Sequence, residues 1–333
     1  MTVPQSSLTF YTSKFVNGVR NYLYWRSNYL QDTLDKSNHV VLQSDHYIAI
    51  GEHADLWEGR MYNRKVAVKV LRGGSSSNSE FLTNFTERLE YEARTWQHLK
   101  HPNVSEFYGL AFNFGHMPAL ILPFYDNGTV VDYVSEKDNN ARLDMVTQIA
   151  QGLEYLHGMS VVHGDLRGSN VLVDAEEHPR ICDYGLAFII EPSEFTSIKT
   201  AGACRWTAPE IMNPPENATS TNHSLALFTE ASDIYAFGMT TLEIFTGKIP
   251  FSQKRNDSSV IFYVLGGGRP ELPAFFKEKE SLARLVQECW DQEPGRRPTS
   301  RAVTEKLLAN AHEENATSGI GNPSKGWFGT SWF

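Results

Sequence analysis

The amino-acid sequence predicts an α+β fold with two lobes: a small lobe built on an antiparallel β-sheet and a larger, mainly helical lobe. The length of 333 residues lies at the upper edge of what one hydrophobic core supports. From His46 onward, turn residues separate short β-prone runs, which read YIAIG, LWEGRMY, KVAVKVLR, FYGLAF and ALILPFY. After the turn DNGT, helical periodicity appears at 141–158, 230–246 and 281–290. The boundary between the lobes is therefore expected near Asp126.

The first 43 residues are expected to form a separate N-terminal extension. Phe15, Val19, Tyr22, Arg26 and Tyr29 recur near helical spacing, which predicts a helix packed on the main domain. Weak contact of this extension with a membrane surface is the alternative.

The main domain is expected at 44–310, with the small lobe at about 44–125, the large lobe at about 126–310 and a flexible tail at 311–333. The Gly/Ser-rich run from Gly73 to Asn78 predicts a flexible connection. The run FLTNFTERLEYEARTWQHLK that follows predicts a helix, and it carries Glu92. In the large lobe, NPPENATSTNHSLALF predicts an exposed loop.

Composition and charge exclude several classes of protein. Hydrophobic residues make up 41% and charged residues 21% of the chain, as in ordinary globular proteins. The formal net charge of −9 argues against a nucleic-acid partner, because such proteins usually carry a basic excess. Three widely spaced cysteines fit neither a disulfide framework nor a CxxC zinc site. Without a secretory signal or a run of roughly 20 apolar residues, we expect no transmembrane segment and a cytoplasmic protein, with the nucleus as the alternative.

A polar loop between two apolar runs carries the first candidate catalytic residues. In VVHGDLRGSNVLVD, the pattern places Asp165 and Asn170 on a loop between two short strands. One of these groups can orient an attacking hydroxyl while the other helps to hold Mg²⁺, which suits phosphoryl transfer. In PRICDYGLA, Asp183 follows the next apolar strand and adds a second hard oxygen ligand. Seen alone, each motif is more typical of an Asp or Asn that caps a turn, but together they favour a magnesium site.

A lysine on a β-strand completes the set. Strand alternation in VAVKVLR puts Lys69 on the same face as Ala67, so the ammonium can project into a cleft lined by small apolar residues. Glu92, on the helix that follows, could pair with Lys69 and hold it toward a phosphate. A surface salt bridge is the alternative reading of this pair.

These motifs together resemble the signature set of eukaryotic protein kinases, in the order VAVK, Glu92, HGDLRGSN, DYG and TAPE. The resemblance spans roughly residues 44–310. It extends to DIYAFGM, TGKIPF and CWDQEPGRRPT, which look like large-lobe segments of tyrosine kinases and of the tyrosine-kinase-like serine/threonine group. The resemblance implies a bilobal protein kinase that transfers the γ-phosphate of ATP to protein Ser/Thr hydroxyls, with Tyr as the alternative acceptor. An ATP-binding pseudokinase that acts as a scaffold and a small-molecule kinase are the other functions it allows.

The resemblance also implies a role for each matching residue. Lys69 would contact the α- and β-phosphates and pair with Glu92, and Asp165 would orient the substrate hydroxyl and accept its proton. Arg167, two residues later, stands where serine/threonine kinases have a lysine. Asn170 and Asp183 would hold Mg²⁺, with Mn²⁺ as the alternative metal. The ATP site would also include Gly51, Leu56, Ala67, Leu122, Pro123, Tyr125 and Leu172.

Further matches imply structural roles. Glu210 would pair with Arg297, and Asp233 would hold the catalytic loop from a central helix. An apolar column that links the lobes would consist of Phe107, Trp96, Tyr184 and His163.

The sequence departs from the family pattern at two places. The glycine-rich loop GxGxxG appears here with Ala49, Gly51 and Ala54 at its three glycine positions. Alanine restricts the backbone where amides approach phosphate, so we expect weaker nucleotide binding or slower turnover. The arginine that usually precedes the catalytic aspartate is Gly164, and this loss of a cation argues against control by phosphorylation of the activation segment. The segment GACRWTAPE is closer to serine/threonine than to tyrosine kinases.

Overall fold

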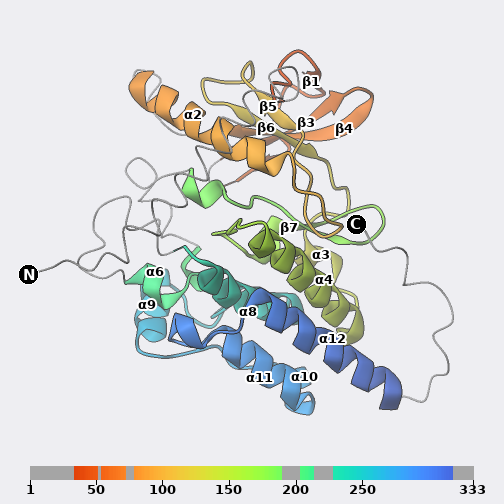
Figure 1. Ribbon diagram of the computed structural model, residues 1–333, viewed down its shortest axis with the longest axis vertical. Helices are drawn as coiled ribbons and strands as arrows, with labels where there is room; N and C mark the ends of the chain where they lie inside the picture. The colour runs from red at the N-terminus through yellow and green to blue at the C-terminus, as the bar shows by residue number, and fades with distance from the viewer. Residues whose placement is uncertain (1–33, 52–53, 73–78, 190–202, 214–227, 318–333) are drawn as a thin grey trace, which may run out of the picture.

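The computed structural model describes residues 34–51, 54–72, 79–189, 203–213 and 228–317. It confirms the predicted α+β fold, with a sheet and one long helix stacked above a mainly helical lobe (Figure 1). The chain passes from the small lobe to the large lobe just after the strand that ends at Pro123.

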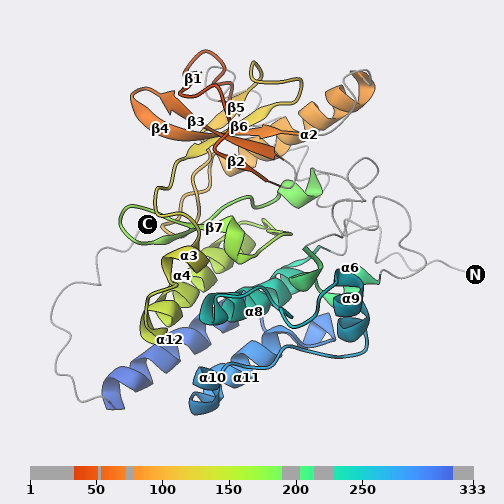
Figure 2. The same ribbon diagram turned by 180° about the vertical axis from the view of Figure 1, so that it is seen from behind.

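The sheet of the small lobe is antiparallel and has the strand order β1-β3-β4-β6-β5, with β2 paired to β3. Tyr62 and Asn63 join β3 to β4 and both have positive φ, as a tight hairpin turn requires. Figure 2 shows β2 on the side of the sheet nearest the large lobe. The strands are β1 (Val40–Leu42), β2 (Ala49–Ile50), β3 (Ala54–Met61), β4 (Arg64–Leu71), β5 (Gly109–Ala111) and β6 (Ala119–Pro123).

The helix α2 (Ser79–Trp96) packs one apolar face against this sheet. Phe85, Leu89, Ala93 and Trp96 recur every three or four residues and are all buried. They share a core with residues of β3 and β4, including Ala54 and Leu71. The apolar spacing therefore decides which face of the helix meets the sheet.

The small lobe begins before the boundary predicted near residue 44. β1 pairs with β3, from Val40 opposite Met61 to Leu42 opposite Gly59. At the opposite edge of the sheet, Asp35 lies beside Leu110 of β5, and Leu110 exchanges backbone hydrogen bonds with Leu34 and Lys36. Ten residues assigned by sequence to the extension, 34–43, thus lead into the sheet and form part of it.

The large lobe is built around α8 (Glu230–Thr246), which is buried along nearly its whole length. It contacts α4 (Asn139–Gly158) and α11 (Glu280–Cys289), and α12 (Ser300–Thr317) packs along α4. Thr229 and Ser232 cap the start of α8 reciprocally, and Gly247 ends it with a φ of +62°. The remaining elements are α3 (Val130–Tyr133), β7 (Val171–Val173), β8 (Pro179–Ile181), α6 (Pro209–Met212), α9 (Asp257–Leu265) and α10 (Ala274–Glu278).

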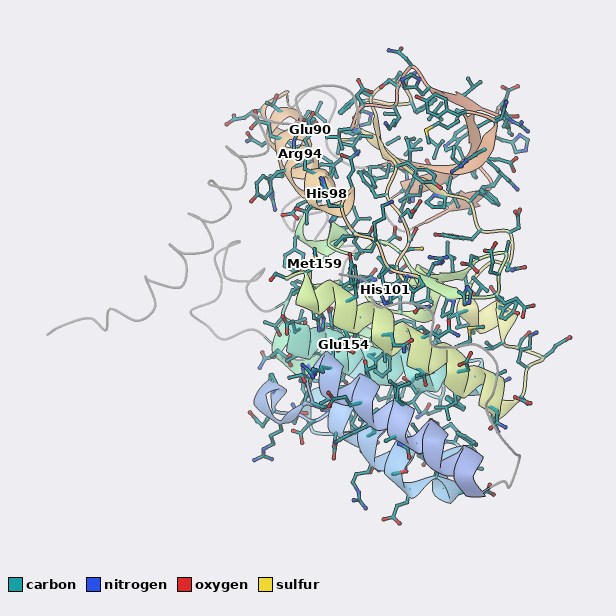
Figure 3. All side chains as sticks on the ribbon, turned by 45° about the vertical axis from the view of Figure 1, so that its right-hand side comes forward. Glu90, Arg94, His98, His101, Glu154 and Met159 are labelled. Atoms are coloured by element: carbon teal, nitrogen blue, oxygen red, sulfur yellow. The ribbon has the colours of Figure 1, made fainter. Side chains whose placement is uncertain are left out.

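His101 lies where the end of α2 meets α4. Figure 3 shows Glu90, Arg94 and His98 along the outer side of α2, with His101 beyond them beside α4. The His101 ring stacks on Tyr155 of α4 at a centroid distance of 4.9 Å, and its Nδ1 accepts the Asn103 backbone N–H at 3.1 Å. Burial, aided by the charge of Arg180, lowers the pKa of His101 to about 4. The imidazole is therefore neutral and part of the junction between the lobes.

Some sequence predictions fall outside the described residues. The predicted N-terminal helix and its membrane contact lie in 1–33, and the predicted flexible connection lies at 73–78. Most of the predicted exposed loop and most of the tail are also outside, although the backbone of α12 continues as helix to Thr317. Among the described residues, no helix combines the length and apolarity needed to cross a membrane.

Candidate active site

A buried carboxylate on α8 holds the loop that carries Asp165. Asp233 accepts the backbone N–H of His163 at 2.7 Å and that of Gly164 at 2.9 Å. His157 Nε2 lies 2.9 Å from one of the same two oxygens. Since α8 is central to the large lobe, these bonds tie the position of the loop to the core.

Within this loop, Asp165 has contacts that orient its carboxylate. The Asn170 side-chain amide donates to the Asp165 carbonyl at 2.7 Å and to its carboxylate at 2.9 Å. Arg167 Nη2 lies 3.4 Å from the same carboxylate oxygen. The side chain of Asp165 is still 35% exposed, so a substrate can reach it. The structure thus brings the three loop residues predicted for catalysis and metal binding together.

Asp183 follows β8 and lies close to the same loop. The Cys182 backbone N–H donates to the Asn170 carbonyl at 2.8 Å, and Asp183 itself has a φ of +62°. Its carboxylate forms an ion pair with Lys69 of β4 at 2.5 Å. Burial by itself would raise the pKa of Asp183, but the charge and hydrogen bond of Lys69 hold that pKa below its ordinary value. Asp183 is therefore ionised at neutral pH.

The donor set of this site fits Mg²⁺. The amide nitrogen of Asn170 makes both bonds to Asp165, so its oxygen is left to accept from a metal. The ionised carboxylate of Asp183 is a second hard oxygen ligand. Asn170 and Asp183 would hold the ion, which would neutralise charge on bound phosphates.

The predicted pair of Lys69 and Glu92 is not formed. Within the part of the chain that the structure describes, the ion pair of Lys69 joins it to Asp183 and none joins it to Glu92. Burial raises the pKa of Glu92, with the charge of Arg88 opposing that shift. Arg88, one turn earlier on α2, donates to the carbonyl of Phe188. The placement of α2 relative to β4 decides which carboxylate reaches Lys69, and here it is Asp183.

Four of the residues predicted around the adenine lie on the neighbouring strands β3, β4 and β6 of the small-lobe sheet. Ala67 of β4 is opposite Leu122 of β6, and Leu56 of β3 is opposite Lys69. Pro123 ends β6 opposite Val66, and Leu172 lies on β7, where it pairs with Arg180. The Tyr125 hydroxyl donates to Ser105 Oγ at 3.1 Å.

Leu122, one of these residues, lines a small pocket together with Asp183. Its walls include members of the predicted apolar column. Trp96 contacts Phe107 edge to face at 5.5 Å and Tyr184 at 6.1 Å, and Gly185 N–H donates to the His163 carbonyl at 3.0 Å. The Tyr184 hydroxyl donates to the Ser105 carbonyl at 2.8 Å. The pocket is lined by Trp96, Ser105, Phe107, Leu120, Leu122, Asp183, Tyr184 and Leu186.

Gly164 has a backbone conformation and surroundings that disfavour a side chain. Its φ is +81°, and a Cβ added there would lie 2.8 Å from the Cβ of Ala187. The rings of Phe188 and Phe228 pack edge to face at 5.8 Å, and each has a carbon 3.5 Å from that added Cβ. Apolar groups therefore surround Gly164, at the position where the family usually has arginine.

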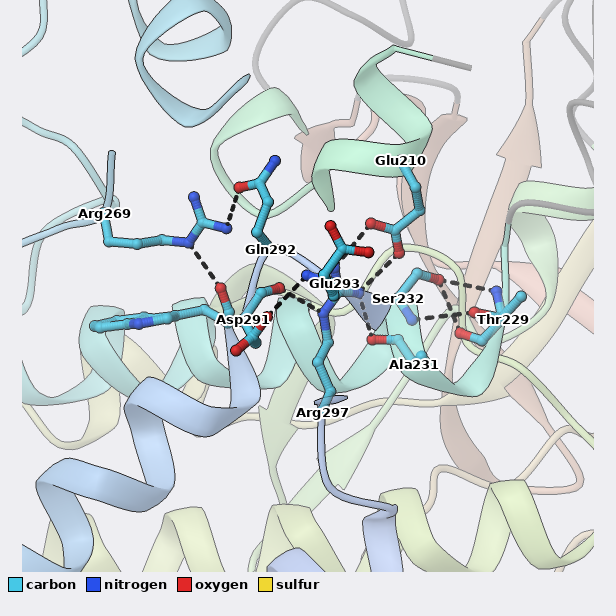
Figure 4. Close-up of polar contacts among 10 residues, drawn as sticks. Glu210, Thr229, Ala231, Ser232, Arg269, Asp291, Gln292, Glu293 and Arg297 are labelled. Atoms are coloured by element: carbon cyan, nitrogen blue, oxygen red, sulfur yellow. Dashed lines mark hydrogen bonds and ion pairs between the residues drawn. The ribbon is translucent and has the colours of Figure 1, made fainter. Parts of the chain in front are cut away.

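The predicted structural ion pair between Glu210 and Arg297 is present. Figure 4 shows Arg297 reaching from the segment after α11 to Glu210 of α6. The two guanidinium nitrogens donate to the two carboxylate oxygens at 2.7 and 2.8 Å. Arg297 also donates to the Ala231 carbonyl at the start of α8, at 2.9 Å. Through the bidentate contact with Glu210 and the bond to Ala231, Arg297 links α6 to the start of α8.

Glu243 and Trp206, which the sequence reasoning missed, form a hydrogen-bonded link to the catalytic loop. One carboxylate oxygen of Glu243 on α8 accepts the Gly168 backbone N–H at 2.8 Å and the Trp206 indole N–H at 2.9 Å. Burial raises the pKa of Glu243, while these bonds and the charge of Arg167 oppose the shift. Trp206 lines a small pocket that also includes Asp165. A glutamate within the otherwise uncharged run of α8 after Asp233 was the available sequence signal.

Comparison with known proteins identifies the family. The family model described as protein tyrosine and serine/threonine kinase matches residues 42–307. The chain is 26% identical to serine/threonine-protein kinase STY46 of Arabidopsis thaliana over 276 residues, covering 82% of this chain and 44% of that protein. It is 28% identical to mitogen-activated protein kinase kinase kinase 10 of Xenopus laevis over 279 residues, covering 80% of this chain and 26% of that protein.

The chain spans less than half the length of each of these two relatives. The family match, by contrast, covers most of the chain, including both lobes and every residue of the site described above. The chain therefore belongs to the protein tyrosine and serine/threonine kinase family.

Proposed function

We propose that this protein is an active protein kinase that transfers the γ-phosphate of ATP to serine and threonine hydroxyls of protein substrates. The observation that carries the proposal is the accessible Asp165 carboxylate, which Asn170 and Arg167 orient beside the ionised Asp183 and Lys69. This arrangement supplies a base for the acceptor hydroxyl and charges for the phosphates within one connected set of contacts.

In the proposed reaction, the acceptor hydroxyl lies against Asp165, which takes its proton as the hydroxyl oxygen bonds to the γ-phosphorus. The bond between that phosphorus and the oxygen shared with the β-phosphate breaks, and ADP leaves with the electron pair. Lys69 attracts the α- and β-phosphates, and Asn170 and Asp183 would hold Mg²⁺, which would neutralise charge on the phosphates.

Two observations support serine and threonine as acceptors. The relatives STY46 and STY17 of Arabidopsis thaliana carry the name serine/threonine-protein kinase. In this chain, the segment that ends at Glu210 reads GACRWTAPE, and it has no proline before Trp206, where the equivalent segment of tyrosine kinases carries one. We also propose a cytoplasmic location, since the cysteines Cys182, Cys204 and Cys289 are free, buried thiols.

The test is transfer of label from γ-labelled ATP to a general protein substrate in the presence of Mg²⁺. Asp165→Asn is the matched control, because it keeps the shape of the side chain and removes the base. We expect transfer by the wild-type chain, loss of at least about a hundredfold in the variant, and phosphoserine or phosphothreonine in the product. ATP binding without transfer above the variant would instead indicate a pseudokinase scaffold, and phosphotyrosine alone would overturn the acceptor assignment.

A further inference from the structure

We propose that Arg72 is a positioning residue for the binding of ATP, because it holds Gly51 and Asp55 of the β2–β3 hairpin in place. The inference rests on the proposed function in one respect, namely that the cleft binds ATP. It concerns the part of the site in which this chain departs most from its family, where Ala49 and Ala54 replace two glycines.

The hairpin is paired up to its turn. Ala49 lies opposite Leu56, and Ile50 lies opposite Asp55. At the turn, the Gly51 N–H donates to the Ala54 carbonyl at 2.8 Å. A Cβ at Gly51 would lie only 3.1 Å from that carbonyl oxygen, so a side chain at the one retained glycine would crowd the opposite arm.

Arg72 contacts both arms of this hairpin from a third strand. It directly follows β4, and its Nη2 donates to the carbonyl of Gly51. Its Nε lies 3.5 Å from the carboxylate of Asp55 on β3. Arg72 comes three residues after Lys69 on the same stretch of chain, so its contacts relate the hairpin directly to the strand that carries the phosphate-binding lysine.

Ala54 adds a second restraint at the base of the turn. It is 2% exposed and lies opposite Leu71 of β4. Its methyl group belongs to the core that contains Phe85 and Leu89 of α2. A glycine would lack this packing and would leave the backbone freer, because it adds no Cβ. The alanine thus joins the β3 side of the turn to the core of the lobe, and Arg72 contacts Gly51 on the β2 side.

These contacts predict an effect on nucleotide binding rather than on folding. Ion pairs between exposed side chains contribute little to stability, and the side chain of Arg72 is 44% exposed. A hydrogen bond from a charged group to a backbone carbonyl, however, restricts the loop that must cover the phosphates. A loop that is already ordered costs less free energy to arrange around a ligand. Without the guanidinium, ATP should bind more weakly while the fold persists.

The experiment compares the full chain carrying Arg72→Gln, Arg72→Lys or Asp55→Asn with wild type. Arg301→Gln is the matched control, because Arg301 is an exposed arginine in an ion pair with Glu305 on α12, far from the cleft. The dissociation constant of Mg²⁺-ATP is measured by titration calorimetry, and KM values for ATP and for the protein acceptor are measured separately. Thermal midpoints report on folding.

We expect Arg72→Gln to weaken ATP binding about three- to tenfold, with the acceptor KM unchanged and the thermal midpoint within about 2 °C of wild type. Arg72→Lys should recover part of the affinity, because it keeps a cation that can reach the Gly51 carbonyl. Asp55→Asn should have a smaller effect, and Arg301→Gln none.

Equal ATP affinity in Arg72→Gln and wild type would overturn the proposal, as would an equal loss in Arg301→Gln. A change in thermal midpoint without a change in ATP affinity would also overturn it and make Arg72 a structural residue only. If the wild-type chain binds ATP but transfers no phosphate, the proposed kinase activity fails, and the calorimetric comparison still decides the role of Arg72. If the wild-type chain binds no ATP, both proposals fail.

Discussion

Replacing Asp233 with asparagine should destabilise the large lobe and displace the catalytic loop. Asp233 is 1% exposed on α8 and accepts backbone N–H groups from His163 and Gly164, with His157 at the same carboxylate. Asparagine has the same shape but only one oxygen. Its NH₂ group would face a donor, so one backbone N–H of the loop would be left buried without an acceptor.

The magnitude follows from the bonds that are lost. A hydrogen bond to a charged group contributes roughly 1.5–3 kcal/mol, and a buried unsatisfied donor costs roughly 1–3 kcal/mol. We therefore expect Asp233→Asn to lower the free energy of unfolding by roughly 2–4 kcal/mol, a large part of the roughly 5–15 kcal/mol typical of a folded protein. Asp233→Ala leaves both N–H groups without a partner and should cost more.

The assay is urea unfolding at neutral pH, followed by tryptophan fluorescence, together with turnover at a temperature where each variant is folded. Thr241→Val is the matched control. Thr241 is equally buried on the same helix, but its hydroxyl donates only to the Phe237 carbonyl within the helix. Turnover should fall in the Asp233 variants and not in the control. A loss of less than about 0.5 kcal/mol in Asp233→Asn would refute the reasoning.

Three further predictions address the cleft and the lobe junction. Lys69→Met should lower turnover by at least about tenfold with little change in the thermal midpoint, and unchanged turnover would contradict its role. Trp206→Phe removes the indole donor to Glu243 and should raise the KM for the protein acceptor roughly fivefold, while the KM for ATP stays constant. A change in the KM for ATP alone would contradict this prediction. The pKa of His101 is about 4 in the folded protein against an ordinary value near 6.5, so the unfolded chain binds more protons between these values. The free energy of unfolding should therefore fall as the pH drops through that window. His101→Phe keeps a ring against Tyr155 and should make the free energy of unfolding depend less on pH. Denaturant titrations at several pH values measure this dependence, and an unaltered dependence in the variant would disprove the cause.

Most of the fold could be predicted because its signals are local. The helices predicted at 141–158, 230–246 and 281–290 are observed at Asn139–Gly158, Glu230–Thr246 and Glu280–Cys289. Apolar periodicity, and the capping residues Asp138 of α4 and Thr229 of α8, act within a few turns, so these signals do not depend on distant partners. The start of the small lobe was placed too late, because β1 has only three residues and its pairing with β3 depends on residues some 20 positions away.

The candidate site divides in the same way. The sequence by itself determined which chemical groups the site holds, since Lys69 belongs to a β-prone run and Asp165, Asn170 and Asp183 stand in polar segments beside short apolar runs. Only the tertiary structure decided how these groups pair. Lys69 meets Asp183 rather than Glu92 because that choice depends on how α2 lies against the sheet. Arg72 reaches Gly51 and Asp55 because two strands bring them together. Packing between separate elements sets these contacts, and no local pattern in the sequence encodes it.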